Sequence, residues 1–340
     1  MTKISIAMCT YNGAIHLEEQ LQSFLAQDRL PYELQVGDDG SMDATLDILS
    51  AFAASAPFPV VVHRNDERLG FGRNFTETAR RCRGEWIAFS DQDDVWDSRK
   101  LSLCANTIGS VGERVNLLIH AYTRFKHNGS ETTDVIEFAT GLIDRSDVSI
   151  DYEPGGFQQI FRRSLLDRVP FDRHPMPWVG FPQAHDVRTW LTSYAVGDVY
   201  YLAEPLVRHR RHGLNVTHGA ADDRQTIAKT SDARSNNRAH YIRVGQIRRE
   251  MSLMFSALAL ESKDDSDRNS LRTIANELGQ QSRWLEQRGK LYSGLSLPDR
   301  IQTYAGLLLR MAYRSGNSGL GQKSALKDAA YTLAPSLIFD

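Results

Sequence analysis

Short apolar runs alternate with segments of helical periodicity along the first 125 residues, and this alternation limits the possible folds more than any other feature. Between the runs, apolar residues recur at three- and four-residue spacing, as in Leu17, Leu21 and Phe24, which is typical of helices. Strands and helices that alternate in this way predict βαβ units, and therefore an α/β domain with a mainly parallel sheet flanked by helices. The predicted strands cover residues 4–8, 34–36, 60–62, 86–89 and 117–122.

The composition is that of a globular protein. With 340 residues, of which 41% are hydrophobic, the chain can form two domains or one large domain with an extension. A net charge of -2 is too balanced to predict a nucleic-acid partner, although basic residues gather at 208–212. Cys9, Cys82 and Cys104 lack a C-x-x-C spacing, so neither a disulfide framework nor a cysteine zinc site is indicated, and a reducing, cytoplasmic setting fits best.

We expect one domain over residues 1–220 and a helical C-terminal extension over residues 221–340. From about residue 222 the composition turns polar, residues 231–237 are typical of a linker, and helical periodicity follows. The N-terminus lacks a charged leader and no run of about 18 apolar residues occurs, so we expect neither a signal peptide nor a transmembrane helix.

Polar clusters follow three of the predicted strands. They are residues 9–13 (CTYNG), 37–41 (GDDGS) and 90–93 (SDQD). Ligands of parallel sheets bind at the carboxyl ends of the strands, so we expect these clusters to face one crevice.

The last cluster contains two carboxylates in D-x-D spacing, Asp91 and Asp93. Side chains two apart in an extended chain share a face, and carboxylates this close repel one another unless a cation lies between them. A divalent cation such as Mg²⁺ would supply that charge. The alternative is a solvated turn in which Asp94 or Asp97 caps the following helix, and these residues alone do not decide between the two. Asp38 and Asp39, expected opposite the D-x-D, favour the ligand site because they offer acceptors for a base imide and ribose hydroxyls.

Four segments together resemble the family 2 glycosyltransferases, which are inverting enzymes of the GT-A fold. The segments are 9–13, 36–43, 72–74 and 89–96, and their order and spacing match over about residues 1–215. FSDQDDVW at 89–96 is especially similar to the rhamnosyltransferase-like branch of bacterial surface polysaccharide synthesis.

The resemblance implies a GT-A fold with a nucleotide-sugar-binding half (1–125) and an acceptor side (126–220). It also implies metal-dependent, inverting transfer of rhamnose or another hexose from a UDP- or dTDP-sugar to a saccharide acceptor, in O-antigen, capsule or exopolysaccharide assembly. A non-catalytic nucleotide-sugar-binding or scaffold protein is the alternative. A phosphatase would carry its acidic pair after the first strand, where this chain has Thr10, Tyr11 and Asn12.

Site roles are implied by position in the family motifs. Tyr11 would flank the pyrimidine, Asp39 would accept from the base, and Asp91 would hold the ribose or a metal-bound water. Mg²⁺ or Mn²⁺ would be bound by Asp93, with Asp91 and His212. Cys9 and Gly37 depart from the residues common in relatives, which puts detail of the base pocket in question. The donor-binding residues implied are Thr10, Tyr11, Asn12, Asp38, Asp39, Arg73, Asn74, Asp91 and Arg211.

Asp186 resembles the catalytic base of the family. An inverting transfer needs a general base to deprotonate the acceptor hydroxyl, and a carboxylate at a helix start can serve. A helix N-cap is the alternative for an isolated His-Asp pair, but the upstream motifs favour the base.

His212, Gly213 and Asn215 resemble the H-G-x-N segment that closes over the diphosphate. A neutral imidazole can complete a metal shell, and Arg208, Arg210 or Arg211 can neutralise phosphate. Zinc is not favoured, because the histidines at 209, 212 and 218 lack closely spaced cysteine or carboxylate partners.

The acceptor side is implied by a glycine-containing segment at 154–159, whose glycines would let a sugar approach the backbone. An ordinary turn is the alternative. We interpret Trp96 and Trp190 as packing residues. The predicted acceptor-binding residues are Gly155, Gly156, Gln158, His185 and Trp178.

The C-terminal helices carry more basic than acidic residues, interleaved with apolar ones such as 307–309. They could lie on an anionic membrane surface at the inner face of the cytoplasmic membrane, near a lipid-linked acceptor. A helical cap or a surface of a homo-oligomer is the alternative.

Overall fold

The computed structural model describes residues 2–126, 132–144, 154–168, 185–212, 233–310, 312 and 322–333. It divides into two compact units. Of the described residues, the first unit holds those up to 143 with 154–168 and 185–212, and the second holds the helices from residue 233 onward. The predicted domain boundary near residue 220 lies outside the described residues and stays a prediction.

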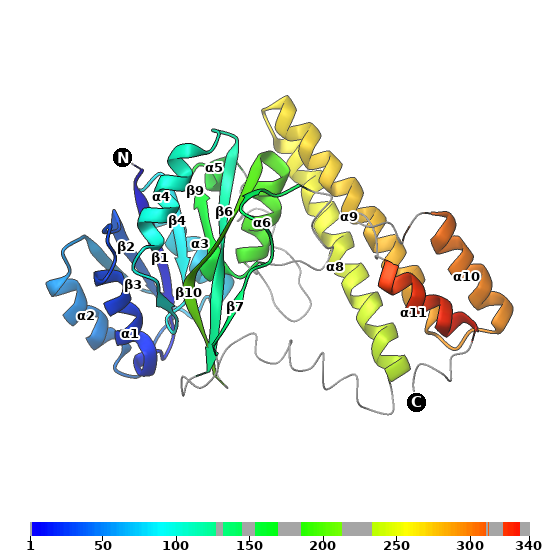
Figure 1. The fold of residues 1–340 in the computed structure, drawn as a ribbon, viewed down its shortest axis with the longest axis horizontal. Helices are drawn as coiled ribbons and strands as arrows, with labels where there is room; N and C mark the ends of the chain where they lie inside the picture. The colour runs from blue at the N-terminus through cyan, green and yellow to red at the C-terminus, as the bar shows by residue number, and fades with distance from the viewer. Residues whose placement is uncertain are drawn as a thin grey trace. The chain divides into compact units, whose positions relative to one another are not determined.

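A ten-stranded sheet organises the first unit. Strands β1, β2, β3 and β4 pair in parallel, as predicted, whereas β9 runs antiparallel between β4 and β6. The sheet is mixed: β6 and β10 also pair in parallel, whereas β5, β7, β8 and β9 pair antiparallel with their neighbours. The expected parallel pairing is thus confirmed for β1 to β4 and for β6 with β10. The strand order is β3 (Val60–Arg64), β2 (Glu33–Asp38), β1 (Ile4–Thr10), β4 (Trp86–Ser90), β9 (Gln159–Arg162), β6 (Val115–Lys126), β10 (Asp198–Arg211) and β5 (Val95–Trp96), with β7 (Thr132–Val135) beside β6 and β8 (Gly141–Leu142) beside β10. Figure 1 labels all of these strands except β5 and β8.

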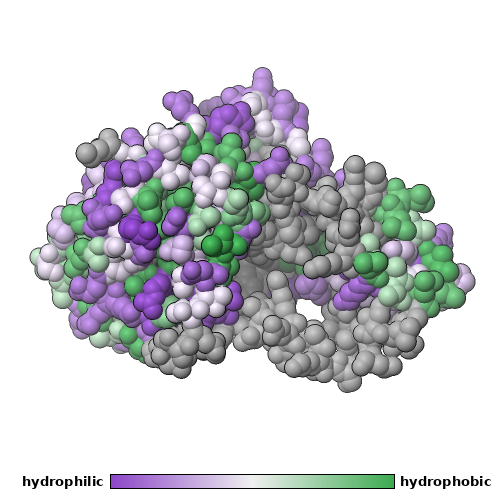
Figure 2. Space-filling model, in the orientation of Figure 1, coloured by the Kyte–Doolittle hydropathy of each residue, from purple (hydrophilic) through white to green (hydrophobic). Residues whose placement is uncertain are grey.

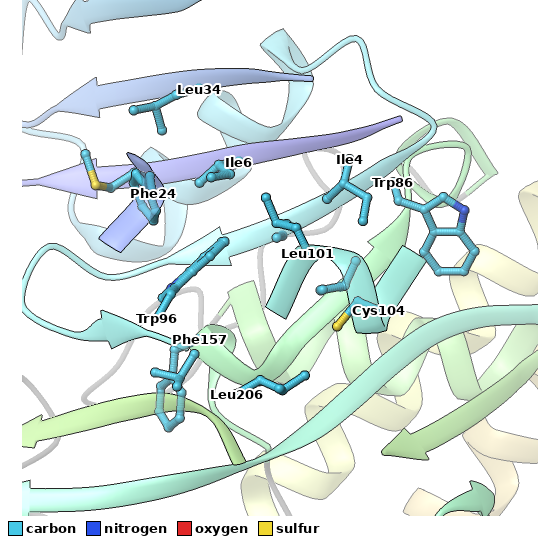
Figure 3. Close-up of a cluster of buried hydrophobic side chains, with 14 of the residues drawn as sticks. Ile4, Ile6, Phe24, Leu34, Trp86, Trp96, Leu101, Cys104, Phe157 and Leu206 are labelled. Carbon is cyan, nitrogen blue, oxygen red and sulfur yellow. The ribbon is translucent and has the colours of Figure 1, made fainter. Parts of the chain in front are cut away.

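One hydrophobic core joins the two predicted halves of this unit. Helical positions such as Leu17 and Phe24 are fully buried against strand residues such as Ile6. Trp96 contacts Phe24 edge-on at 4.8 Å and lies near Phe157 of the acceptor side (Figure 3), so it is a packing residue, as expected. The helices are α1 (Ala14–Leu25), α2 (Thr45–Ser55), α3 (Phe71–Arg81), α4 (Lys100–Ser110), α5 (Leu165–Arg168) and α6 (His185–Val196).

Gly37 is required by the close approach of α3 to β2. A Cβ atom at this position would lie 2.2 Å from Thr78 Oγ1 and 2.3 Å from Asn74 Oδ1. Asn74 Nδ2 donates to the Gly37 carbonyl at 2.8 Å. The larger apolar residue that relatives often carry here cannot fit beside this asparagine, which explains the departure noticed in the sequence.

Two long helices, α8 (Ala233–Glu261) and α9 (Asp265–Leu291), form the centre of the second unit. Met251 and Phe255 of α8 are buried, as are Leu271 and Ile274 of α9, so the helical periodicity predicted a real packing face. Gly289 allows this contact, because a Cβ there would lie 3.0 Å from Ile242 Cγ1.

A buried ion pair connects α9 to α11 (Gln322–Leu333). Arg288 Nε lies 2.7 Å from Asp328 Oδ2, and Tyr292 donates to the other carboxylate oxygen at 2.7 Å. The Arg288 guanidinium also lies over the Tyr241 ring at 4.3 Å. These partners compensate the cost of burying the two charges.

The helix α10 (Leu297–Leu309) presents large apolar side chains to solvent. Ile301, Leu308 and Leu309 are 47%, 48% and 84% exposed, and Figure 2 shows hydrophobic surface on this unit. Within the described ranges, no helix combines the length and the apolar character needed to span a bilayer.

Candidate active site

The structure brings the three polar clusters together at one edge of the sheet. In the strand registers, Thr10 lies opposite Asp38, and Met8 lies opposite Ser90. Gln92, in the middle of the D-x-D, accepts a hydrogen bond from the Tyr11 backbone N–H at 2.9 Å and donates to the Tyr11 carbonyl at 3.2 Å. The Gln92 side-chain amide therefore links the loop after β1 to the loop after β4.

Asp38 is a structural residue of this edge, and its contact with the donor stays a prediction. It is fully buried. One carboxylate oxygen accepts from the N–H groups of Gly40 and Ser41, and the other accepts from the hydroxyls of Thr10 and Ser41. A carboxylate offers about four acceptor positions, and these four hydrogen bonds use all of them. The Thr10 hydroxyl is engaged by Asp38 in the same way.

Asp39 positions the loop at residues 65–70 beside Tyr11. Its carboxylate accepts from the N–H groups of Leu69 at 2.7 Å and Gly70 at 2.9 Å. In the same loop, the Arg68 guanidinium lies 3.9 Å from the centroid of the Tyr11 ring. Tyr11 is 38% exposed, so an aromatic face and a carboxylate lie together where a base was expected.

Asn12 and Asn74 both make hydrogen bonds within this part of the fold, and their donor contacts stay predictions. Asn12 has a positive φ of 47°, and its side chain accepts from the Met42 N–H at 2.8 Å. Asn74 is buried with its amide on the Gly37 carbonyl. The Asn12 side chain thus links two loops, and the Asn74 side chain links α3 to β2.

Two other residues predicted to bind the donor, Arg73 and Arg211, lie nearer the surface. Arg73 is about half-exposed, and its guanidinium forms an ion pair at 3.6 Å with Glu67. Arg211 is the last residue of β10, directly before His212. Donor contacts of both residues stay predictions.

The acidic loop after β4 is tied to β10. Asp93 Oδ2 lies 2.7 Å from His212 Nε2, so this predicted pair is brought together. Asp94 is fully buried and accepts from His209 Nδ1 and from the Arg210 N–H, both at 3.0 Å. Asp94 therefore does not cap the next helix.

Asp97 holds the turn before α4. Its carboxylate accepts from the Arg99 N–H at 2.9 Å, whereas α4 itself begins without a side-chain cap. The alternative of an aspartate that caps this helix is therefore wrong for Asp97 as well as for Asp94.

Electrostatics separates these carboxylates from ordinary surface acids. Burial raises the pKa of Asp91 well above its usual range, and the charges of Asp94, Asp93 and Asp186 raise it further. Burial also raises the pKa of Asp93, although His212 opposes the shift. Desolvated acids that repel one another are stabilised by a bound cation.

The residues fit a divalent cation whose shell is completed by a ligand. Among the described residues, no group of three His, Cys, Asp or Glu side chains is already arranged to hold a metal. Asp91, Asp93 and His212 are thus not a closed three-ligand site. Carboxylate oxygens of this loop with one imidazole are suitable donors for Mg²⁺ or Mn²⁺ when phosphate oxygens and water supply the rest.

Asp186 lies in the first turn of α6, and its charge acts on Asp91 of the acidic loop. Its Oδ1 accepts from the Val187 N–H at 2.8 Å. Burial raises its pKa from the ordinary 3.8 to about 6, and its charge is felt at Asp91. A carboxyl group with a pKa near neutrality, beside a second acid, is suited to proton transfer.

His185 is buried among aromatic rings, and its predicted acceptor contact stays a prediction. Its ring stacks on Phe75 at 3.9 Å between centroids and meets Phe89 edge-on at 4.7 Å. Burial lowers the pKa of His185 to about 3, so the imidazole is neutral. A Cβ at Gly156 would lie 2.6 Å from His185 Nε2, so this glycine makes room for the histidine.

Gln158 is likewise an internal residue, and its acceptor contact stays a prediction. Its amide donates to the His120 carbonyl at 3.0 Å and accepts from the Gly155 N–H at 3.1 Å. These bonds hold the short turn η2 (Gly156–Gln158). Trp178 lies outside the described residues. Trp190 is buried on Tyr194, as expected for packing.

Two site residues escaped the sequence reasoning, Gln92 and Lys100. Lys100 is fully buried, and burial lowers its pKa to about 7. A lysine at a helix start usually suggests a surface position, and the sequence gives no signal of its burial. Gln92 stood inside the quoted motif, but its partner at Tyr11 depends on the pairing of β1 with β4.

The chain is similar to several known proteins. Residues 5–169 match the model of Glycosyl transferase family 2. The uncharacterized protein Rv1520 of Mycobacterium tuberculosis is 29% identical over 238 residues, which are 67% of this chain and 64% of that protein. The dTDP-rhamnosyl transferase RfbG of Shigella flexneri is 36% identical over 98 residues, which are 28% of this chain and 34% of RfbG.

Solved structures show the same architecture. The structure of TarS 1–349 of S. aureus in complex with UDP-GlcNAc aligns with a TM-score of 0.57 and 16% identity, covering 99% of this chain and 89% of that chain. At this identity the likeness concerns the fold, and it confirms the GT-A fold that the motifs predicted.

Proposed function

We propose that the chain is a family 2 glycosyltransferase that transfers a sugar, with inversion, from a nucleoside diphosphate donor to a saccharide acceptor; residues 5–169 match the model of that family. One observation carries the proposal. Asp186, with its pKa raised to about 6, shares a desolvated region with Asp91 at the end of β4. A base and a donor-binding acid are thereby available in one site, which a binding protein without turnover does not need.

The donor side is assigned to the loops after β1, β2 and β4. Tyr11 and Asp39 are proposed to receive the pyrimidine, with Arg68 at the same ring. Asp91, Asp93 and His212 would hold Mg²⁺ or Mn²⁺, which when bound supplies positive charge against the departing diphosphate. The likeness to RfbG, named a dTDP-rhamnosyl transferase, supports a dTDP- or UDP-sugar and favours rhamnose.

The transfer itself is a single displacement in which Asp186 accepts the proton of the acceptor hydroxyl. The hydroxyl oxygen attacks the anomeric carbon from the face opposite the diphosphate. The bond between that carbon and the diphosphate oxygen breaks as the new glycosidic bond forms, and the diphosphate leaves with the electron pair. His185 stays neutral in its aromatic surroundings and fixes the start of α6 through its packing.

The acceptor is proposed to be a saccharide of bacterial surface polysaccharide assembly, in free or lipid-linked form. The exposed apolar residues of α10, with Arg310 at its end, support contact with an anionic membrane surface. Oligomerisation stays a prediction.

The proposal is tested by nucleotide release. The protein is incubated with UDP-, dTDP- and GDP-sugars and Mn²⁺, with acceptors offered in solution or in anionic vesicles. We expect acceptor-dependent release from one pyrimidine donor and faster release with vesicles. Donor binding without release under any acceptor would favour the non-catalytic alternative, and equal rates with and without vesicles would contradict membrane contact.

A further inference from the structure

Lys100 is a buried cation next to the acidic loop, and the transfer described above does not use it. Its Nζ donates to the Phe157 carbonyl at 3.0 Å and lies 3.6 Å from the centroid of the Trp96 ring. The side chain has no exposed surface. Burying an ammonium costs free energy unless its charge is compensated. An apolar side chain of similar length, such as methionine, would avoid that cost at a purely apolar position.

The two contacts of Lys100 belong to opposite sides of the site. Trp96 follows the acidic loop, and Phe157 lies in the η2 turn. In that turn, the Gly156 N–H stabilises the Asp186 carboxylate, and Gly156 leaves room for His185. Lys100 thus connects the donor loop to the turn that supports the proposed base.

The carboxylates of the same loop partly compensate the charge of Lys100, although burial still lowers its pKa to about 7. Asp94 Oδ1 is bonded to β10, but its buried Oδ2 has no hydrogen-bond partner in the described chain. The ammonium and the carboxylates of Asp94 and Asp91 attract one another. The Phe157 ring closes the arrangement by stacking on His209 at 4.3 Å, the residue that binds Asp94.

We propose that Lys100 is a positioning residue: its ammonium is the internal countercharge of the loop at residues 91–94 and holds the η2 turn against that loop. This role rests on the proposed function. Lys100 and a divalent cation are like charges attracted by the same carboxylates, so they oppose each other. Removing the ammonium should therefore tighten metal binding and, because the η2 turn loses its anchor, slow the transfer.

The test compares Lys100→Met with wild type by Mn²⁺ titration without donor and by steady-state transfer. We expect Mn²⁺ affinity to rise about fivefold, as for loss of one nearby like charge, while kcat falls about tenfold through misplacement of Asp186. Lys100→Gln keeps an N–H donor toward the Phe157 carbonyl. It should show the same gain in Mn²⁺ affinity with part of kcat restored.

Lys3→Met is the matched control, because Lys3 also lies over an aromatic ring, Tyr32 at 5.0 Å, at the other end of β1. It should change neither quantity. Weaker or unchanged Mn²⁺ binding in a folded Lys100→Met protein would overturn the proposal, as would failure of both Lys100 variants to fold. If wild type binds Mn²⁺ but transfers no sugar, the proposed function fails, while the Mn²⁺ comparison still decides whether Lys100 is the countercharge.

Discussion

Replacing Asp186 with asparagine should lower the rate of sugar transfer about a thousandfold while leaving donor binding intact. Asparagine keeps the shape of the side chain and can still accept the Val187 N–H bond, but it cannot take a proton from the acceptor. The rate is measured as acceptor-dependent nucleotide release, and donor binding by calorimetry with the nucleoside diphosphate and Mn²⁺.

Asp167→Asn provides the matched control for this substitution. Asp167 also stands in the first turn of a helix, α5, where it is exposed and lies 3.8 Å from Arg163. Its replacement should change neither rate nor binding. If Asp186→Asn transfers sugar at the normal rate, the base lies elsewhere in the chain.

The same carboxyl group predicts the acid limb of the pH profile. A base acts in its ionised form, and burial raises the pKa of Asp186 from the ordinary 3.8 to about 6. The value of kcat should therefore fall roughly tenfold per pH unit below about pH 6 and level off above it. A profile that stays flat down to pH 5 would mean that Asp186 does not limit the reaction.

Replacing Asp93 with asparagine should weaken Mn²⁺-dependent donor binding by about a hundredfold. The amide oxygen can keep the hydrogen bond with His212, so the change removes the negative charge and leaves the local contact. Without Mn²⁺, wild type and variant should bind the nucleoside diphosphate equally weakly. Calorimetric titrations with Mn²⁺ and with a chelator measure both values.

Asp97→Asn serves as the control for this charge. Asp97 lies four residues further along and pairs with Arg99 at 2.9 Å at the start of α4. Its loss should cost stability and leave donor affinity unchanged. If neither Asp93→Asn nor the chelator changes donor affinity, donor binding does not depend on a metal.

Much of the fold is predictable because its signals are local. Apolar side chains recur every two residues in strands and about every 3.6 residues in helices, and this spacing located β1, β4 and α1 to within a few residues. The apolar runs at 199–202 and 206–210 predict two separate strands, but the structure has one long strand, β10, with register shifts around Pro205. Proline lacks the N–H that a regular ladder needs, so the sequence indicated an interruption and the structure shows an irregularity.

The site was predictable in its position and less so in its details. Strand ends located the acidic loop, and the family motif located Asp93, His212 and Asp186. The roles of Asp38 and Gln158 depend on partners that the fold brings from distant segments, such as the His120 carbonyl for Gln158. A polar residue that satisfies a buried carbonyl and one that binds a sugar have the same letter in the sequence.

The anomeric configuration of the product tests the central claim most directly. Once the donor is known, NMR of the transferred sugar can be compared with that of the donor. Direct attack by an acceptor that Asp186 has deprotonated predicts the inverted configuration. A retained configuration would mean either attack from the face of the departing diphosphate or a covalent sugar-enzyme intermediate, and both would contradict the role proposed for Asp186.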